Sequence, residues 1–168
     1  MEIRLAGIVN DSIVDGTGLR LTVFVQGCPH NCPGCHNPQT HSFDGGYMAD
    51  TDDILAAAQK DPLLEGLTFS GGEPFMQPLP LADLAKKAHK AGYNIFCYTG
   101  FLYEDILKDA DKRILLENVD FLVDGPFIEA QKSLLLNFRG SKNQRIIDVA
   151  KSLEANTVIT ADLDTEEI

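Results

Sequence analysis

Three cysteines lie close together in the segment GCPHNCPGCHN, with the spacing C-x3-C-x2-C. The segment is rich in Pro, Gly and Asn, which is typical of a loop, so Cys28, Cys32 and Cys35 share one short loop. Three thiolates on such a loop can converge on a single inorganic centre. An iron–sulfur cube normally takes four cysteine ligands, so three leave one iron without a protein group. By analogy with zinc, an open coordination position is typical of a catalytic site.

Structural zinc is the alternative interpretation of the same loop, because His30, His36 or His41 would complete a Cys3His site. The fourth cysteine, Cys97, lies in the apolar stretch IFCY and is expected to be a buried small apolar residue rather than a ligand.

A second motif, LTFSGGEP, follows an expected strand. Gly71 and Gly72 carry no side chains, so a ligand can approach the backbone closely there, with Glu73 nearby. An ordinary turn before a helix is the alternative, because Gly-Gly and Glu-Pro are common in turns. The two motifs in this order, each after a strand, are more specific than either alone.

Together these motifs resemble the radical S-adenosylmethionine superfamily. Further segments are similar to the anaerobic ribonucleoside-triphosphate reductase activating proteins, a family of glycyl-radical activating enzymes, from about Val14 to Arg145. The matching segments are DGTGLR, GCPHNCPGCHNPQT, SGGEP, CYTGF, VDFLVDGPF and FRGSKNQR. Two positions depart from the family pattern: His41, where an aromatic residue is frequent, and Thr17, where proline is frequent.

The resemblance implies a [4Fe–4S] cluster on Cys28, Cys32 and Cys35, and S-adenosylmethionine as the second cofactor. A flavodoxin or ferredoxin would supply one electron, and S-adenosylmethionine would be cleaved to methionine and a 5′-deoxyadenosyl radical. That radical would remove a hydrogen atom from a backbone glycine of the reductase. A homodimer within a larger complex is implied as well.

Several other residues are assigned to the cofactor site by the same resemblance. Gly34, Cys35 and His36 would line the S-adenosylmethionine site, although His36 could instead be a surface loop residue, and Gly71, Gly72 and Glu73 would meet the methionine amino group. Asp124, at the end of VDFLVDG, would contact the ribose or the methionine, although a turn-capping role is an equal alternative. A basic group, comprising Arg139, Lys142 and Arg145, is either a solvated loop or a contact with the partner or a cofactor carboxylate. Tyr98, Thr99 and Phe101 either support the cavity or end a strand.

Two rival functions remain open at this point. The target could be another glycyl-radical enzyme, such as pyruvate formate-lyase, or a small molecule, as in 7-carboxy-7-deazaguanine synthase. A zinc-stabilised binding module without activity is the alternative from a different class.

The elements that would position these residues alternate along the chain. Strands are predicted at 19–27, 67–72, 93–100 and 119–125, because these runs are apolar, partly β-branched and end at glycine. Helices are predicted at 50–60, 80–92 and 103–117. The N-terminal segment indicates a short strand, 128–144 is irregular, and the TVIT segment is a candidate final strand.

This alternation predicts an α/β fold with parallel strands and helical crossovers. A closed eightfold barrel needs about 250 residues, so the 168 residues favour an open partial (β/α) barrel in a single domain. We expect a radical S-adenosylmethionine domain over 1–160 and an acidic, mobile tail over 161–168.

Composition limits the partners. The formal net charge of −11 argues against nucleic-acid binding and against docking on anionic lipid. No signal peptide or membrane-spanning run is seen, so a soluble cytoplasmic protein is expected, and its cysteines would stay reduced.

Overall fold

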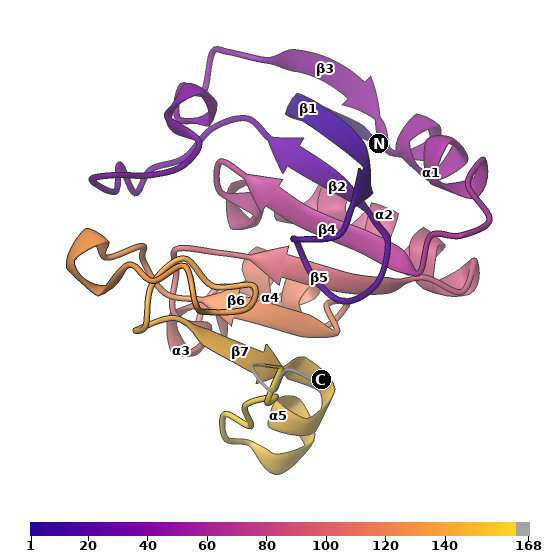
Figure 1. The fold of residues 1–168 in the computed structure, drawn as a ribbon. Coiled ribbons are helices and arrows are strands. Elements are labelled where there is room, and N and C mark those ends of the chain that lie inside the picture. Colours follow the sequence, from indigo (N-terminus) through magenta and orange to yellow (C-terminus); the bar gives the residue numbers. More distant parts are fainter. Residues whose placement is uncertain (164–168) are drawn as a thin grey trace.

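The computed structural model describes residues 1–163, and its centre is one seven-stranded sheet in the order β3-β1-β2-β4-β5-β6-β7 (Figure 1). The neighbouring pairs β2–β4, β4–β5 and β5–β6 are parallel, whereas β1, β3 and β7 pair antiparallel at the two sides. The strands are β1 Glu2–Ser12, β2 Arg20–Val25, β3 Tyr47–Asp50, β4 Gly66–Gly71, β5 Asn94–Tyr98, β6 Phe121–Asp124 and β7 Arg145–Asp148.

In Figure 1, α2 and α4 lie behind the sheet, α1 lies beside the end of β3, and α5 follows β7 at the other side. The α-helices are α1 Thr51–Gln59, α2 Pro78–Lys90, α3 Tyr103–Ile106, α4 Ala110–Leu116 and α5 Val149–Ala155. Three short 3-10 helices complete the described elements: η1 Pro38–Thr40, η2 Pro74–Met76 and η3 Glu129–Gln131.

The two faces of the sheet differ because successive side chains of a strand point to opposite sides. Along β2, Leu21, Val23 and Val25 belong to the hydrophobic core that the helices cover. Arg20 and Thr22 alternate with them, so they point to the other face. That face therefore carries polar and aromatic groups, which suits a cavity more than a packed core.

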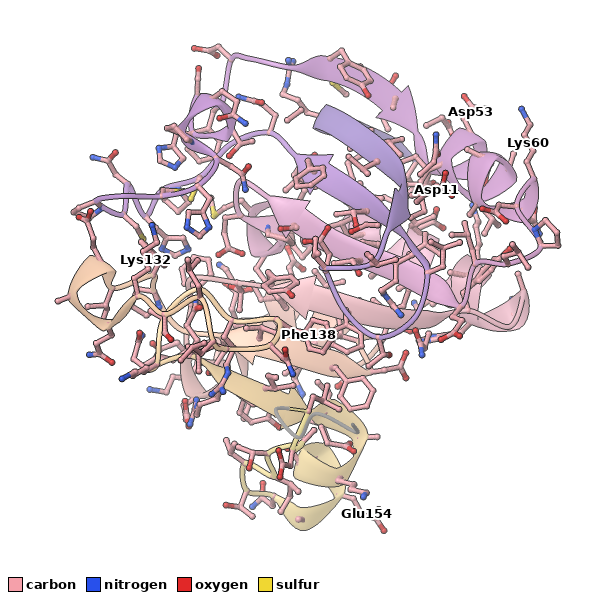
Figure 2. The ribbon with its side chains drawn as sticks, in the orientation of Figure 1. Asp11, Asp53, Lys60, Lys132, Phe138 and Glu154 are labelled. Carbon is pink, nitrogen blue, oxygen red and sulfur yellow. The ribbon has the colours of Figure 1, made fainter. Side chains whose placement is uncertain are left out.

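Two loops cover this open face. In Figure 1 the loop between β1 and β2 passes in front of β4 and β5, and the segment after β6 folds in front of β6. Figure 2 shows Phe138 of the second loop over the sheet, where its ring lies 6.0 Å from that of Phe96. Gly16 of the first loop packs directly on Arg20 and Phe96.

Arg20 is fully buried beneath the first loop and holds it in place. Its guanidinium donates to Thr68 Oγ1 at 2.8 Å and to the carbonyls of Thr17 and Leu67 at 2.9 and 2.8 Å. It also stacks 4.7 Å from the centre of the Phe96 ring. Burial lowers the pKa of Arg20 to about 10, so the side chain stays charged at neutral pH.

The α/β class and the open arrangement predicted from the sequence are confirmed. The predicted strands correspond to β2, β4, β5 and β6, and the predicted helices to α1, α2 and the pair α3 and α4. The segment 128–144 is irregular apart from η3.

Other predictions need correction. The first strand is long, not short, because β1 continues from Glu2 to Ser12 between β3 and β2. The TVIT segment does not form a strand; only Thr160 makes an isolated bridge, to Ile147. Most of the predicted tail lies outside the described residues, and Ala161, which is inside them, donates its N–H to the Ile146 carbonyl at 2.8 Å.

No helix within residues 1–163 is long and apolar enough to cross a membrane.

Candidate functional site

The cysteine loop, residues 28–37, begins where β2 ends, beyond the carboxyl ends of the parallel strands (Figure 1). Two backbone hydrogen bonds tie its start to η1: Gly27 N–H donates to the Thr40 carbonyl at 2.7 Å, and Cys28 N–H to the His41 carbonyl at 3.0 Å. Cys35 N–H donates to the Cys32 carbonyl at 3.2 Å, which closes a turn around Gly34. The loop is therefore held at its base and folded back on itself.

The three thiols line one cavity of about 130 Å³, together with Gly71, Gly72 and the segment 98–100. Cys28, Cys32 and Cys35 are unpaired and half-buried. Partial burial raises the pKa of the Cys28 thiol, and the nearby Glu73 carboxylate raises it further. A positive centre is therefore needed to hold this thiol as a thiolate.

Three soft thiol ligands in one cavity fit an iron–sulfur cluster. A backbone N–H, that of Asn37, points at Cys35 Sγ at 3.5 Å, the type of contact that tunes cluster potentials. Within residues 1–163, no three His, Cys, Asp or Glu side chains gather closely enough to hold a single metal ion.

Cys97 lies apart from the cavity, as the sequence predicts. It is fully buried in the hydrophobic core on the helix side of β5. Burial raises the pKa of its thiol well above the usual value, so it stays a neutral apolar residue.

The glycine pair closes the cavity at the end of β4, but the chain itself needs these glycines. Gly71 has a φ of 94°, and a Cβ there would lie 2.6 Å from the Val25 nitrogen. A Cβ on Gly72 would lie 2.4 Å from the Gly27 carbonyl oxygen. The glycines thus allow the strand ends to approach one another, and both still face the cavity.

Glu73 has a more structural environment than the sequence suggests. Its side chain is fully buried and accepts hydrogen bonds from Thr99 Oγ1, at 2.8 and 2.9 Å to the two oxygens. The backbone N–H groups of Gly100 and Phe75 donate to it at 2.7 and 2.9 Å. His30 Nε2 lies 2.6 Å from Oε1. Glu73 therefore joins the cysteine loop, the end of β5 and η2.

A second cavity of about 340 Å³ adjoins the first and shares Cys35, Tyr98 and Phe127 with it. His36 lines this second cavity, with its ring 5.1 Å from that of Phe127. Gly34, with a φ of 74°, lies on the side of the loop that faces Glu129. The second cavity is lined by further polar groups, those of Asp15, Ser70, Arg139 and Gln144.

Tyr98 and Thr99 lie on the wall of the first cavity. Burial raises the pKa of the Tyr98 phenol, and the Asp15 carboxylate raises it further, so this phenol stays protonated.

Asp124 is not brought to either cavity, contrary to the expected cofactor contact. Its fully buried carboxylate accepts from Tyr103 N–H at 2.9 Å and from two nitrogens of Arg145, at 3.0 and 2.5 Å. The side chain points to the helix side of β6, where it caps the start of α3. The capping alternative therefore describes its contacts.

The predicted basic group separates in the structure. Arg145 pairs with Asp124 and Glu104, whose carboxylates raise its pKa. Arg139 lines the second cavity and donates to the Gln144 carbonyl at 3.3 Å. Lys142 is exposed. Only Arg139 is therefore placed to meet a ligand of the second cavity.

Sequence reasoning did not assign roles to several residues of the site. His30 was considered only as a zinc ligand, and Phe127, Gln144 and Gly100 were not singled out, although all line the first cavity. The YTG and DGPF segments follow predicted strands and could have indicated Gly100 and Phe127, because parallel strands of α/β folds place their functional loops at their carboxyl ends.

Comparisons with known proteins show the family of this chain. Residues 14–147 match the model of the 4Fe-4S single cluster domain family. The anaerobic ribonucleoside-triphosphate reductase-activating protein of Vibrio cholerae is 37% identical over 143 residues, covering 80% of this chain and 90% of the relative. The protein of that name from Escherichia coli K12 is 33% identical, covering 79% of this chain and 90% of the relative.

A pyruvate formate-lyase-activating enzyme from Clostridium pasteurianum is 35% identical, covering 70% of this chain but only 53% of the relative. Among solved structures, QueE from Escherichia coli aligns with a TM-score of 0.49 at 20% identity, over 60% of this chain and 53% of that one.

The matched region contains all three loop cysteines and both strand-end glycines, and the match to the reductase-activating proteins extends over nearly their whole length. This chain belongs to the 4Fe-4S single cluster domain family and, within it, to the anaerobic ribonucleoside-triphosphate reductase-activating proteins.

Proposed function

We propose that this protein activates an anaerobic ribonucleoside-triphosphate reductase by reductive cleavage of S-adenosylmethionine. The observation that carries the proposal is the single cavity that joins three free thiols to the glycines at the end of β4. Cys28, Cys32 and Cys35 would hold the [4Fe–4S] cluster. When bound, the cluster supplies the electron that cleaves the C5′–S bond, giving methionine and a 5′-deoxyadenosyl radical that takes a hydrogen atom from a glycine of the reductase.

The chain's own residues would bind and shield the cofactor. Gly71 and Gly72 place backbone against the cavity, where the methionine amino group would be held. Cys35 and His36 would line the rest of the cofactor site, together with Phe127, whose ring is shared by the two cavities, and Gly34 would allow the turn that precedes Cys35. We assign Glu73 a supporting role, because its carboxylate already accepts hydrogen bonds from three chain segments.

The proposal is tested by anaerobic reconstitution with iron and sulfide, reduction with dithionite and addition of S-adenosylmethionine. We expect 5′-deoxyadenosine by chromatography, and a glycyl-radical signal by electron paramagnetic resonance once the reductase is added. A protein that binds iron and sulfide but forms no 5′-deoxyadenosine would contradict the proposal.

Activation of a pyruvate formate-lyase is the second candidate, because a relative of that name matches 70% of this chain. Coverage favours the reductase: the chain spans 90% of the reductase-activating relatives but 53% of the lyase-activating one. The radical signal obtained with each of the two partners decides between them.

The surface around the second cavity supports a protein as the reactant. Val14 and Leu136 line that cavity, and their neighbours Ile13, Leu134 and Leu135 are 72%, 91% and 93% exposed. Strongly exposed apolar side chains are frequent at interaction surfaces, and these three are next in the chain to residues that line the cavity.

A leucine pair tests this surface. Leu134→Ser with Leu135→Ser is expected to lower the yield of glycyl radical while 5′-deoxyadenosine formation without partner stays unchanged. The control is Leu63→Ser, since Leu63 is 73% exposed but lies between α1 and β4, away from both cavities. Equal yields from both variants would exclude these leucines from the contact.

The remaining partner assignments rest on the family resemblance. We propose flavodoxin or ferredoxin as the electron donor, a homodimer as the assembly and the cytoplasm as the location. Pull-down of the donor and analytical ultracentrifugation under anaerobic conditions test the first two.

A further inference from the structure

One hydrogen bond joins the cysteine loop to the glycine-rich strand end. His30 Nε2 lies 2.6 Å from Glu73 Oε1, and the two residues are separated by 43 positions in the chain. The Glu73 side chain is 0% exposed and that of His30 is 17% exposed. Since His30 stands between Cys28 and Cys32, this contact holds the loop between its first two cysteines, beyond the two backbone bonds at its base.

The end of β5 is shaped to receive the His30 ring. A Cβ on Gly100 would lie 2.6 Å from His30 Cδ2 and 2.8 Å from Nε2, so only glycine leaves room for the ring. Phe101 packs edge-on against the same ring, with centroids 4.5 Å apart. Thr99 and Gly100 also donate to the carboxylate that His30 meets.

Burial of Glu73 does not by itself require His30. The carboxylate already accepts from Thr99 Oγ1 and from the N–H groups of Gly100 and Phe75. These donors satisfy the buried charge without the histidine. The contact with His30 is therefore an addition to the hydrogen bonds that the buried carboxylate itself needs.

We propose that His30 is a positioning residue that locks the cysteine loop to Glu73, so that the three thiols and the cavity wall at Gly71 and Gly72 keep one fixed geometry. The inference rests on the proposed function, because it is the cluster and the methionine group that would be held in register. It predicts that binding of S-adenosylmethionine and the environment of the cluster respond together when the contact is lost.

Paired variants separate the hydrogen bond from the packing. His30→Phe keeps a ring beside Phe101 but has no donor, whereas His30→Gln keeps a donor near the position of Nε2. The matched control is His89→Phe, because His89 Nε2 makes a similar 2.7 Å contact with Asp120 but lies on α2, outside both cavities.

The reconstituted proteins are compared by electron paramagnetic resonance of the reduced cluster, before and after S-adenosylmethionine, and by KM and kcat for its cleavage. His30→Phe is expected to broaden the spectrum, weaken its response to S-adenosylmethionine and raise KM about tenfold, as for loss of one hydrogen bond to a charged group. His30→Gln should return both readouts toward the parent protein, and His89→Phe should leave them unchanged. Identical spectra and KM for His30→Phe and His89→Phe would overturn the proposal.

A second test reaches the contact from the other side. Gly100→Ala displaces the ring while His30 is still present, so it should increase hydrogen exchange across residues 28–37 in the protein without cluster. In a His30→Ala background the same substitution meets no ring and should add little, which is the non-additivity of coupled positions. Additive effects would refute the contact.

These readouts distinguish the two failures. If the parent protein makes no 5′-deoxyadenosine, the proposed function is wrong, but hydrogen exchange and the cluster spectra still test the positioning role of His30. If His30→Phe cleaves S-adenosylmethionine normally and its cluster spectrum is unchanged, the positioning role alone is wrong.

Discussion

At the scale of single residues, half-buried thiols line the cavity, and one fully buried carboxylate, that of Glu73, lies behind its wall. The thiols of Cys28, Cys32 and Cys35 are accessible to an incoming metal, whereas Cys97 is enclosed by the core. Whether a cysteine of this chain can bind a metal is therefore decided by its exposure and not by its residue type.

Replacing the loop cysteines one at a time tests this distinction. Cys28→Ala, Cys32→Ala and Cys35→Ala are each expected to lose almost all cluster absorption after anaerobic reconstitution, because two remaining thiolates hold a cube poorly. Cys97→Ala should retain the full iron and sulfide content. Loss of the cluster in Cys97→Ala, with the fold intact by circular dichroism, would place a fourth ligand in the core.

Glu73→Gln tests the buried carboxylate. The amide would turn an N–H group toward donors from Thr99, Gly100 or Phe75, so one buried donor loses its acceptor. The free energy of unfolding should fall by about 1–3 kcal/mol, measured by urea denaturation without cluster. Glu117→Gln, at an exposed position, is the control and should change it by less than about 0.5 kcal/mol.

Spacing alone pointed to the three cysteines and the two strand-end glycines that line the first cavity, because their signal is local. The contact between His30 and Glu73 was not predictable in this way, since its partners are 43 positions apart and meet only when β2, β4 and β5 are aligned. Asp124 shows the converse. Its place at a strand end suggested the cavity, but alternation along β6 turns its side chain toward the helices.

At the scale of elements, three of the α-helices, α1, α4 and α5, begin at an aspartate. Asp50, Asp109 and Asp148 accept from the backbone N–H groups of Asp52, Lys112 and Lys151 and cap α1, α4 and α5. The sequence prediction used the acidic start of α1 but overlooked α5. It also missed β3 and β7, because four-residue strands beside irregular segments carry too little periodicity.

Arg145 joins the edge strand β7 to β6 and α3 through ion pairs with Asp124 and Glu104, which differ in burial. Asp124 is 0% exposed, whereas Glu104 is 51% exposed. Asp124→Asn should reduce the free energy of unfolding by about 2 kcal/mol, because a charged hydrogen-bond acceptor is lost from a buried position. Glu104→Gln should cost under about 1 kcal/mol, as for surface pairs. Thermal or urea unfolding of both variants is the measurement, and equal losses would show that burial of Asp124 contributes nothing.

At the scale of the whole molecule, the chain carries a formal net charge of −11, yet individual carboxylates are stabilised as anions. A hydrogen bond from Arg145 lowers the pKa of Glu104, and the Lys112 backbone N–H lowers that of Asp109. Because these pKa values are lower in the folded protein than in the unfolded chain, their stabilisation is present above the unfolded values, about 4, and is lost as pH falls through the folded ones.

The melting temperature should therefore be nearly constant from neutral pH to about 5 and decrease below about 4. The double variant Glu104→Gln with Asp109→Asn should show a smaller decrease over the same acid range. Differential scanning calorimetry at constant ionic strength is the measurement. A parallel decrease in the double variant and the parent protein would assign acid unfolding to other carboxylates.

The two faces of the sheet differ in role: the helix-covered face forms the hydrophobic core, and the other face borders the cavities. The hydrophobic core includes no residue of the segment 126–144, although that segment borders both cavities. Substitutions at its exposed positions leave the hydrophobic core untouched, so they should change the free energy of unfolding little. The exposed leucines of this segment can thereby be exchanged to suit another protein target, while Phe127 and the cysteine loop that line the cavities are kept.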